Sequence, residues 1–444
     1  MFSRRGFVKL GAASIASMAL RRFGLLPALA QSSPADYRAL VCVFLFGGND
    51  SNNMVVPVDD TSFQQYTSIR GNLALSSSDL TSPVYAGNNA PYAFHAGLTE
   101  VASLFSNKEL AVVANVGTLV QPTTRAGYQS QSTPLPVNLF SHSDQQLQWQ
   151  TSIPSGHSAT GWAGRAADLM ASQNASTFPT FLSVAGNSLL GEGTNTQPIA
   201  LAPGQSLDLK GFTTSAASQA RREALENLLT LDTGVKLAQA SNSVMSNSIA
   251  DAQALDNALS KTSLQTTFPK TSLGAQLQQI AQIIQARDGL GMRRQIFFAS
   301  LGGFDTHSGE LNTLRMLYPQ LSQALAAFQD ALAELGVQNQ VTTFTESDFS
   351  RTFQPTSSDG SDHAWGSHHL VMGGAVRGRN IYGQFPEFAL GGPDDADVRG
   401  RWIPTTAIDQ YGATLCSWFG VQDSDLVKVF PNFPNFGSAK LGFV

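Results

Sequence analysis

Cysteine is scarce in this sequence of 444 residues, which contains only two, Cys42 and Cys416. A framework of disulfide bonds is therefore excluded as the basis of the fold. Cys42 lies in the most apolar run of the chain, and Cys416 lies near the C-terminus. We expect both to be buried thiols, with a single bridge between them as the alternative.

The sequence also lacks an apolar segment long enough to cross a membrane, for which a helix needs about 20 residues. The weakly apolar stretch 10–20 is too short, and Arg21 and Arg22 would lie inside any longer helix. We therefore expect no stable membrane span in the mature chain.

An arginine pair precedes that stretch, in the sequence SRRGFVK at 3–9. This pattern is typical of a twin-arginine signal peptide, and Ala28-Leu29-Ala30 matches the small residues at a cleavage site. We expect residues 1–30 to be the signal, cut after Ala30. The twin-arginine export machinery would then be a partner, and the mature protein would be periplasmic or secreted.

Basic residues are fewer than acidic ones: the sequence contains 27 lysines and arginines and 32 acidic residues, which gives a net charge of −5. Five of the positive charges and no acidic residue lie within 1–30, so cleavage would change −5 to −10. An acidic mature surface argues against nucleic acid as a partner. A complete Gly-x-Gly-x-x-Gly motif is absent after the run 39–46, which argues against a dinucleotide.

Short apolar runs that end in glycine or polar residues recur along the chain. The predicted strands are 39–46, 110–116, 181–184, 294–300 and 341–344. The helical patterns between and after them include 97–107, 159–173, 311–335 and 405–419. This alternation predicts an α/β fold with a mostly parallel sheet and helices on both faces, in a single domain over 31–444. Residues 206–287 read as a helical insertion, either packed beside the sheet or a mobile lid.

Carboxylates and imidazoles follow several of the predicted strands. They are Asp50, Asp305, His307, Asp362, His363, His368 and His369. The carboxyl ends of parallel strands share one edge of a sheet, so these residues can converge there. Such a set suits zinc, manganese or iron, and carboxylates can bridge two ions. The alternative is that the acids cap helices and turns and the histidines make ordinary hydrogen bonds.

A nucleophile and a basic group can also be named. Ser141 precedes a predicted helix through Trp149, where the helix N-terminus would favour an alkoxide or a bound phosphate. Simple capping is the alternative for Ser141, and Ser143 with Gln146 reads as a capping box. Arg351 is the candidate for holding an anionic ester, with a surface salt bridge as the alternative.

The twin-arginine leader and three motifs resemble those of the bacterial family known as domain of unknown function 1501. The motifs are VFLFGGNDSNN at 43–53, GFDTH at 303–307 and DHAWGSHHLVMGG at 362–374. That family is similar in turn to the alkaline phosphatase and sulfatase superfamily, whose members place two metals at the carboxyl edge of a parallel sheet. The resemblance implies an alkaline-phosphatase-like fold and Ser141 as the nucleophile. The ligands it implies are Asp50, Asp305, His307, Asp362, His363 and either His368 or His369.

The first hypothesis is therefore an exported hydrolase of phosphate or sulfate esters that binds two divalent ions, zinc foremost, and acts on a small anionic ester. The second is a non-catalytic secreted binding or surface-assembly protein that keeps the fold and one structural metal. Only Thr306 separates Asp305 from His307, whereas the superfamily phosphatases usually place three residues there, and this short spacing motivates the second hypothesis. In a third, no metal binds and the clusters are structural loops.

Overall fold

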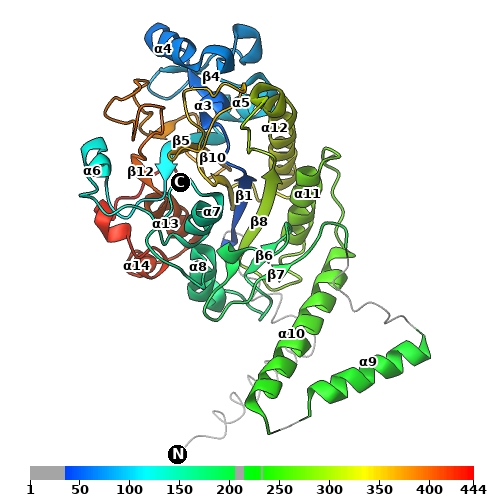
Figure 1. The fold of residues 1–444 in the computed structure, drawn as a ribbon. Coiled ribbons are helices and arrows are strands. Elements are labelled where there is room, and N and C mark those ends of the chain that lie inside the picture. Colours follow the sequence, from blue (N-terminus) through cyan, green and yellow to red (C-terminus); the bar gives the residue numbers. More distant parts are fainter. Residues whose placement is uncertain (1–35, 206–214, 232–233) are drawn as a thin grey trace, which may run out of the picture. The chain divides into compact units, whose positions relative to one another are not determined.

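A nine-stranded sheet forms the centre of this computed structural model, which describes residues 36–205, 215–231 and 234–444 (Figure 1). In spatial order the strands are β11 (Ile381–Gly383), β5 (Leu110–Gly117), β10 (Ser367–Met372), β9 (Val341–Ser347), β1 (Arg38–Phe46), β8 (Arg294–Gly302), β6 (Phe181–Ser183) and β7 (Ile199–Ala200), and β12 (Thr406–Ala407) pairs with β5. β10 is antiparallel to both of its neighbours, whereas the other pairs are parallel. The predicted mostly parallel sheet is thus confirmed.

The central strand β1 shows why these runs form strands. Its apolar residues 39–45 are buried, and the strand pairs in parallel with β8 on one side and β9 on the other. A strand covered on both faces has no polar face, so its sequence is continuously apolar. β10 is not among the predicted strands, because its first residues, Ser367, His368 and His369, are polar.

Helices cover both faces of the sheet. On one face α7 (His142–Thr151), α8 (Trp162–Met170) and α13 (Ile408–Phe419) bury aromatic side chains in the same core as β1 and β9. Figure 1 shows α11 (Ser272–Gln285) and α12 (Glu310–Glu334) on the other side. The predicted α/β layering is confirmed.

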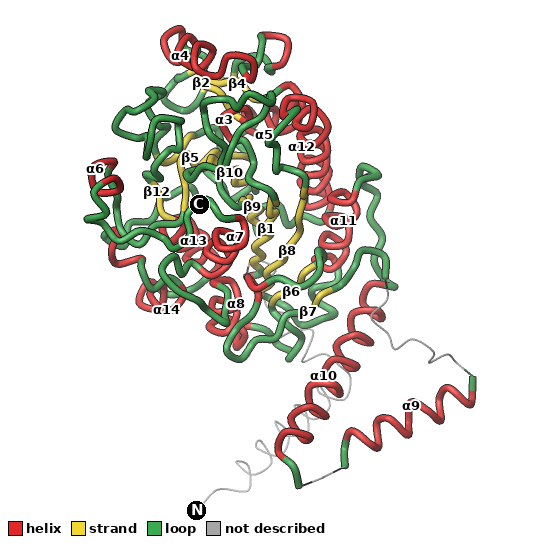
Figure 2. The backbone as a smooth tube through the Cα atoms, viewed as in Figure 1, coloured by secondary structure: helices red, strands yellow, loops and turns green. Residues whose placement is uncertain are grey.

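Smaller elements complete the fold. β2 (Val55–Pro57), β4 (Pro91–Phe94) and β3 (Val84–Tyr85) form a three-stranded antiparallel sheet in the order β2-β4-β3. The remaining helices of this part are α3 (Ser51–Met54), α4 (Asp60–Arg70), α5 (Thr99–Ser106), α6 (Arg125–Gln129) and α14 (Leu426–Val429). Short 3-10 helices lie between several of them. Figure 2 shows the helices in red and the strands in yellow.

The region predicted as a helical insertion contains α9 (Ala216–Leu229), α10 (Lys236–Leu259) and α11. α11 is largely buried against β8 and α12, whereas α9 buries only Ser218. The predicted signal peptide and its cleavage site lie outside the described residues. Within the described part of the chain, no helix is long and apolar enough to cross a membrane. Both cysteines are free and buried, as expected.

Candidate metal centre

The candidate metal centre lies at the carboxyl edge of the sheet, where three segments meet. Asp305 and His307 follow β8, and His363 belongs to the loop between β9 and β10. His142 is the first residue of α7. Because β10 runs against its neighbours, the loop that leads into it stays at the same edge as the ends of β8 and β9.

Three imidazoles converge on one carboxylate. Nε2 of His307 lies 2.9 Å from Nε2 of His363 and 3.1 Å from Oδ1 of Asp305. Nε2 of His142 and of His363 lie 3.4 and 3.7 Å from the same carboxylate oxygen. The ligand atoms of His142, Asp305 and His363 are all within 4.8 Å of one another, which is a spacing that one metal ion can bridge.

The other ring nitrogen of each histidine is held by an oxygen that can only accept. Nδ1 of His142 donates to Asp348 at 2.6 Å, and Nδ1 of His363 donates to the carbonyl of Phe140 at 2.7 Å. Nδ1 of His307 donates to Asp362 at 3.2 Å. In a neutral imidazole the second nitrogen then presents a lone pair, and this arrangement is typical of metal-ligating histidines.

The donor set therefore fits a divalent cation. Three Nε2 lone pairs face Oδ1 of Asp305, which accepts from Arg351, and the lone pairs cannot satisfy one another. Nε2 of His142 is buried without a hydrogen-bond partner among the described residues. Imidazole nitrogen and carboxylate oxygen are ligands that zinc and other divalent transition metals accept.

Asp348 and Phe140 orient the rings of His142 and His363 by binding their Nδ1 atoms, on the side of each ring away from the cluster. The buried carboxylate of Asp348 accepts from the backbone N–H of Gly47 at 3.1 Å and from the side chain of Gln146 at 2.7 Å, in addition to His142. Phe140 has a left-handed backbone with φ of 71°, which is rare for an aromatic residue and is typical of functional sites. Its carbonyl thereby points at His363.

The charges around the site shift several pKa values. The hydrogen bond to Asp348 raises the pKa of His142, whereas partial burial lowers the pKa of His363. Partial burial alone would raise the pKa values of Asp305 and Asp362. Arg351 and Arg399 more than offset this, so both carboxyls end below their usual range and remain ionised ligands or hydrogen-bond acceptors.

Arg351, the residue that sequence reasoning assigned to an anionic ester, is fully buried. Its guanidinium donates to the carbonyls of Gly47, Gly48, Phe304 and Ser361, and it pairs with Asp305. With its nitrogens occupied in this way, Arg351 fixes the loops after β1 and β8 and orients Asp305. It presents no face to a substrate.

Asp50 lies apart from the three imidazoles. Its buried carboxylate pairs with Arg70, which also lies 3.1 Å from Glu310. Asn52 donates to the other oxygen of Asp50 through its backbone and side chain, at 3.2 and 3.1 Å. The positive charge that balances the Asp50 carboxylate in this structure is therefore the guanidinium of Arg70.

His368 and His369 belong to β10, and both are buried, with relative exposures of 2% and 1%. Nδ1 of His368 accepts from the backbone of Asn115 at 3.0 Å, and the ring packs on Phe385. The His369 ring packs on Trp149 and Tyr411. Burial lowers the pKa of each to about 3, so both are neutral. The structure does not bring them into the cluster of His142, His307 and His363.

Ser141 is the N-cap residue of α7, directly before His142. Its hydroxyl donates to Asp144 at 2.6 Å and makes no side-chain cap to the helix. The predicted capping box of Ser143 and Gln146 is wrong, because the helix begins before Ser143 and Gln146 donates to Asp348 instead.

Sequence reasoning missed His142 and three residues that contact the cluster from outside: Asp348, Arg399, which pairs with Asp362, and Arg401, which donates to the carbonyl of His363. The position of His142 next to Ser141 was a usable signal, since the chain has only seven histidines. Asp348 directly follows β9, so its place after a strand was a second usable signal. The two arginines lie in a glycine- and aspartate-rich loop far from any predicted strand, and no pattern in the sequence points to them.

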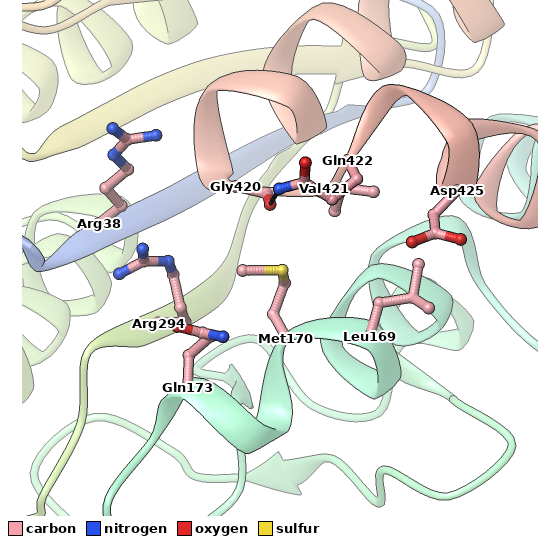
Figure 3. A pocket seen from close by; sticks show the side chains of 9 residues that line it. All are labelled: Arg38, Leu169, Met170, Gln173, Arg294, Gly420, Val421, Gln422 and Asp425. Carbon is pink, nitrogen blue, oxygen red and sulfur yellow. Dashed lines mark hydrogen bonds between the residues drawn. The ribbon is translucent and has the colours of Figure 1, made fainter.

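A separate cavity of about 300 Å³ opens at the other edge of the sheet, where β1 and β8 begin (Figure 3). Arg38 and Arg294, the first residues of these strands, line it together with Met170 and Asp425. It shares no residue with the candidate metal centre.

The model of a family described as "Protein of unknown function (DUF1501)" matches residues 37–399, and the chain therefore belongs to that family. No curated protein matches the chain.

Solved structures similar to the chain include the lipoteichoic acid synthase LtaP from Listeria monocytogenes, with 7% identity, a TM-score of 0.38 and coverage of 91% of this chain and 78% of that one. The phosphonate monoester hydrolase of Agrobacterium radiobacter has 10% identity and a TM-score of 0.33, and the match covers 87% of this chain and 74% of that one. A protein in the alkaline phosphatase superfamily from Vibrio parahaemolyticus has 10% identity and a TM-score of 0.30, and the match covers 87% of this chain and 67% of that one.

Proposed function

We propose that this member of the DUF1501 family is an exported, metal-dependent hydrolase of phosphate or sulfate esters. The observation that supports the proposal most directly is the meeting of three Nε2 lone pairs and the Asp305 carboxylate at the carboxyl edge of the sheet. Ligands of α/β proteins commonly bind at this edge. We also propose that residues 1–30 direct export by the twin-arginine route and that 31–444 is a single domain.

One divalent ion, zinc foremost with manganese or iron as alternatives, would be held by His142, Asp305, His307 and His363. Such an ion supplies Lewis-acid stabilisation of the charge that develops on an ester oxygen. One site is a better match to the structure than two, because Arg70 already neutralises Asp50 and contacts Glu310. The remaining predicted ligand, Asp362, orients His307 from behind.

Ser141 is the proposed nucleophile. It lies one residue from His142, and its hydroxyl donates to Asp144, whose pKa is held below its usual range chiefly by that hydrogen bond. The Ser141 oxygen would attack phosphorus or sulfur, releasing the alcohol and leaving a covalent ester that water then cleaves. Direct attack by water, with Ser141 as a bystander, is the alternative, and Ser141→Ala distinguishes them by abolishing or retaining turnover.

Elemental analysis of the mature protein, purified after export, tests the proposal together with an ester assay. We expect about one equivalent of a transition metal in the wild type and chelator-sensitive cleavage of p-nitrophenyl phosphate or sulfate. Asp305→Ala and His363→Ala should lose both. His157→Ala is the matched control, because His157 is an exposed histidine outside the cluster. Metal-free wild-type protein from every preparation would overturn the metal-dependent mechanism.

A non-catalytic metal-binding protein is the second candidate. The observation in its favour is the single-ion character of the site, which differs from the paired-ion arrangement that the family resemblance implies. One firmly bound ion, lost in His363→Ala, together with no cleavage of either ester at any metal loading, would establish this candidate in place of the hydrolase.

A further inference from the structure

We infer that Arg399 and Arg401 form an anion-binding subsite beside the candidate metal centre and hold a tetrahedral oxyanion there. The inference deepens the proposed function, on which its link to ester substrates rests, because it names the groups that would bind the phosphate or sulfate. Binding of the free oxyanion can be tested without any cleavage.

Both arginines contact the residues that build the cluster. Nη1 of Arg399 lies 2.6 Å from Oδ2 of Asp362, and the other oxygen of Asp362 holds Nδ1 of His307. Nε of Arg401 donates to the backbone carbonyl of His363 at 2.9 Å. One guanidinium is therefore placed behind each of two candidate metal ligands.

The loop 391–401, which contains both arginines, is held by hydrogen bonds to its own backbone. The fully buried carboxylate of Asp395 accepts from four backbone N–H groups, of Gly391, Asp397, Gly400 and Arg401, at 2.9 to 3.1 Å. The guanidinium carbon of Arg401 lies 4.4 Å from the centre of the Phe140 ring, a cation–π contact. Both guanidiniums are thus held in place before any ligand arrives, which lowers the entropic cost of binding.

Donors remain for an external anion. In the described part of the chain, Nε and Nη2 of Arg399 and Nη2 of Arg401 have no hydrogen-bond partner. The two side chains are 32% and 23% exposed, in contrast to the fully buried Arg351. Guanidinium N–H pairs match the oxygens of phosphate and sulfate in two-point contacts.

The charge balance points the same way. The guanidiniums of the site belong to Arg351, Arg399 and Arg401, and the carboxylates around them belong to Asp305, Asp348, Asp362, Asp395 and Asp397. The protein groups alone thus sum to a negative charge. A bound divalent ion would offset that charge, so metal binding should favour anion binding, and anion binding should favour metal binding.

Calorimetric titration of the metal-loaded mature protein with inorganic phosphate, and separately with sulfate, tests the subsite. We expect Arg401→Gln and Arg399→Gln to weaken binding about 10- to 100-fold each, the usual effect of losing a charged hydrogen bond. The anion affinity of Arg401→Lys should lie between those of the wild type and Arg401→Gln, because lysine keeps the charge but lacks the planar guanidinium. Arg315→Gln, at an exposed arginine on α12, is the control and should bind like the wild type.

Metal content is measured on every variant, and only variants that retain the ion are compared. Wild-type affinity for both anions in metal-loaded Arg399→Gln and Arg401→Gln would overturn the subsite, as would a metal-loaded wild type that binds neither anion. Phosphate binding that depends on these arginines, in a protein that cleaves no ester, would support the subsite while overturning the hydrolase.

Discussion

Among the individual residues around the site, Asp348 supports the cluster without being one of its candidate ligands. It is buried, it fixes the ring of His142, and it joins that ring to Gly47 at the end of β1. A carboxylate on Nδ1 also makes Nε2 a stronger ligand, and such outer partners contribute about 10- to 100-fold to metal affinity.

We therefore expect Asp348→Asn to weaken zinc binding by about 10- to 100-fold while leaving the fold intact. The amide keeps the size of the carboxylate but loses its charge, so it holds the His142 proton less strongly. Competition with a chromophoric chelator measures the affinity. Asp409→Asn is the matched control at a buried aspartate away from the cluster, and equal losses in the two variants would contradict a positioning role for Asp348.

At the scale of elements, the turn after β1 needs a glycine. Gly47 has φ of +111°, and a Cβ there would lie 2.5 Å from the backbone nitrogen of Asp305. The loops after β1 and β8 are packed too closely for any side chain between them.

Gly47→Ala should lower the free energy of unfolding by about 1–3 kcal/mol, the usual cost of such backbone strain. It should also weaken metal binding, because Asp305 must move. Urea denaturation and the chelator assay measure the two effects. Gly302→Ala, at the end of β8 with no atom within 4 Å of the added Cβ, should change neither, and a Gly47→Ala protein as stable as Gly302→Ala would refute the packing argument.

The histidines of β10 make the sheet sensitive to acid. Burial lowers the folded-state pKa of His369 to about 3, from 6.5. The unfolded chain therefore binds the extra proton first, and stability is lost as the pH falls from 6.5 towards 3. The slope is about 1.4 kcal/mol per pH unit for each such histidine.

His369→Gln should remove one histidine's share of that slope. Urea unfolding across this pH window would show stability falling less steeply than in the wild type, by about 1.4 kcal/mol per pH unit. His157→Gln, at an exposed position, serves as the control and should keep the wild-type slope. Identical slopes in wild type and His369→Gln would mean that His369 is not buried as a neutral imidazole.

At the scale of the whole molecule, a metal would join distant parts of the chain. Its proposed ligands belong to the start of α7, the loop after β8 and the loop before β10. A ligand that binds only the folded state stabilises it by about 2.7 kcal/mol at 100 times its Kd.

Removing the metal should therefore lower the Tm of the mature protein, and readdition of zinc should restore it. Scanning calorimetry with and without a chelator measures the shift. His363→Ala should begin at the lower Tm and not respond to the chelator, whereas His157→Ala should respond like the wild type. A wild-type Tm that ignores both chelator and zinc would contradict a metal shared by these segments.

The sequence by itself determined the layered α/β fold and the edge where polar residues gather. Runs such as 39–46 could be read because a strand buried on both faces is apolar throughout, and this is a local property. Asp305, His307 and His363 could be named because residues after parallel strands share one edge.

Only the tertiary structure decided which of those residues meet. Asp50 pairs with Arg70, Arg351 is buried among carbonyls, and His368 and His369 are buried on β10 against other aromatic rings. His142 and Asp348 enter instead, although 206 positions separate them. The physical reason is that charge pairing, burial and ring orientation depend on side chains from distant segments, and such contacts leave no periodic pattern in the sequence.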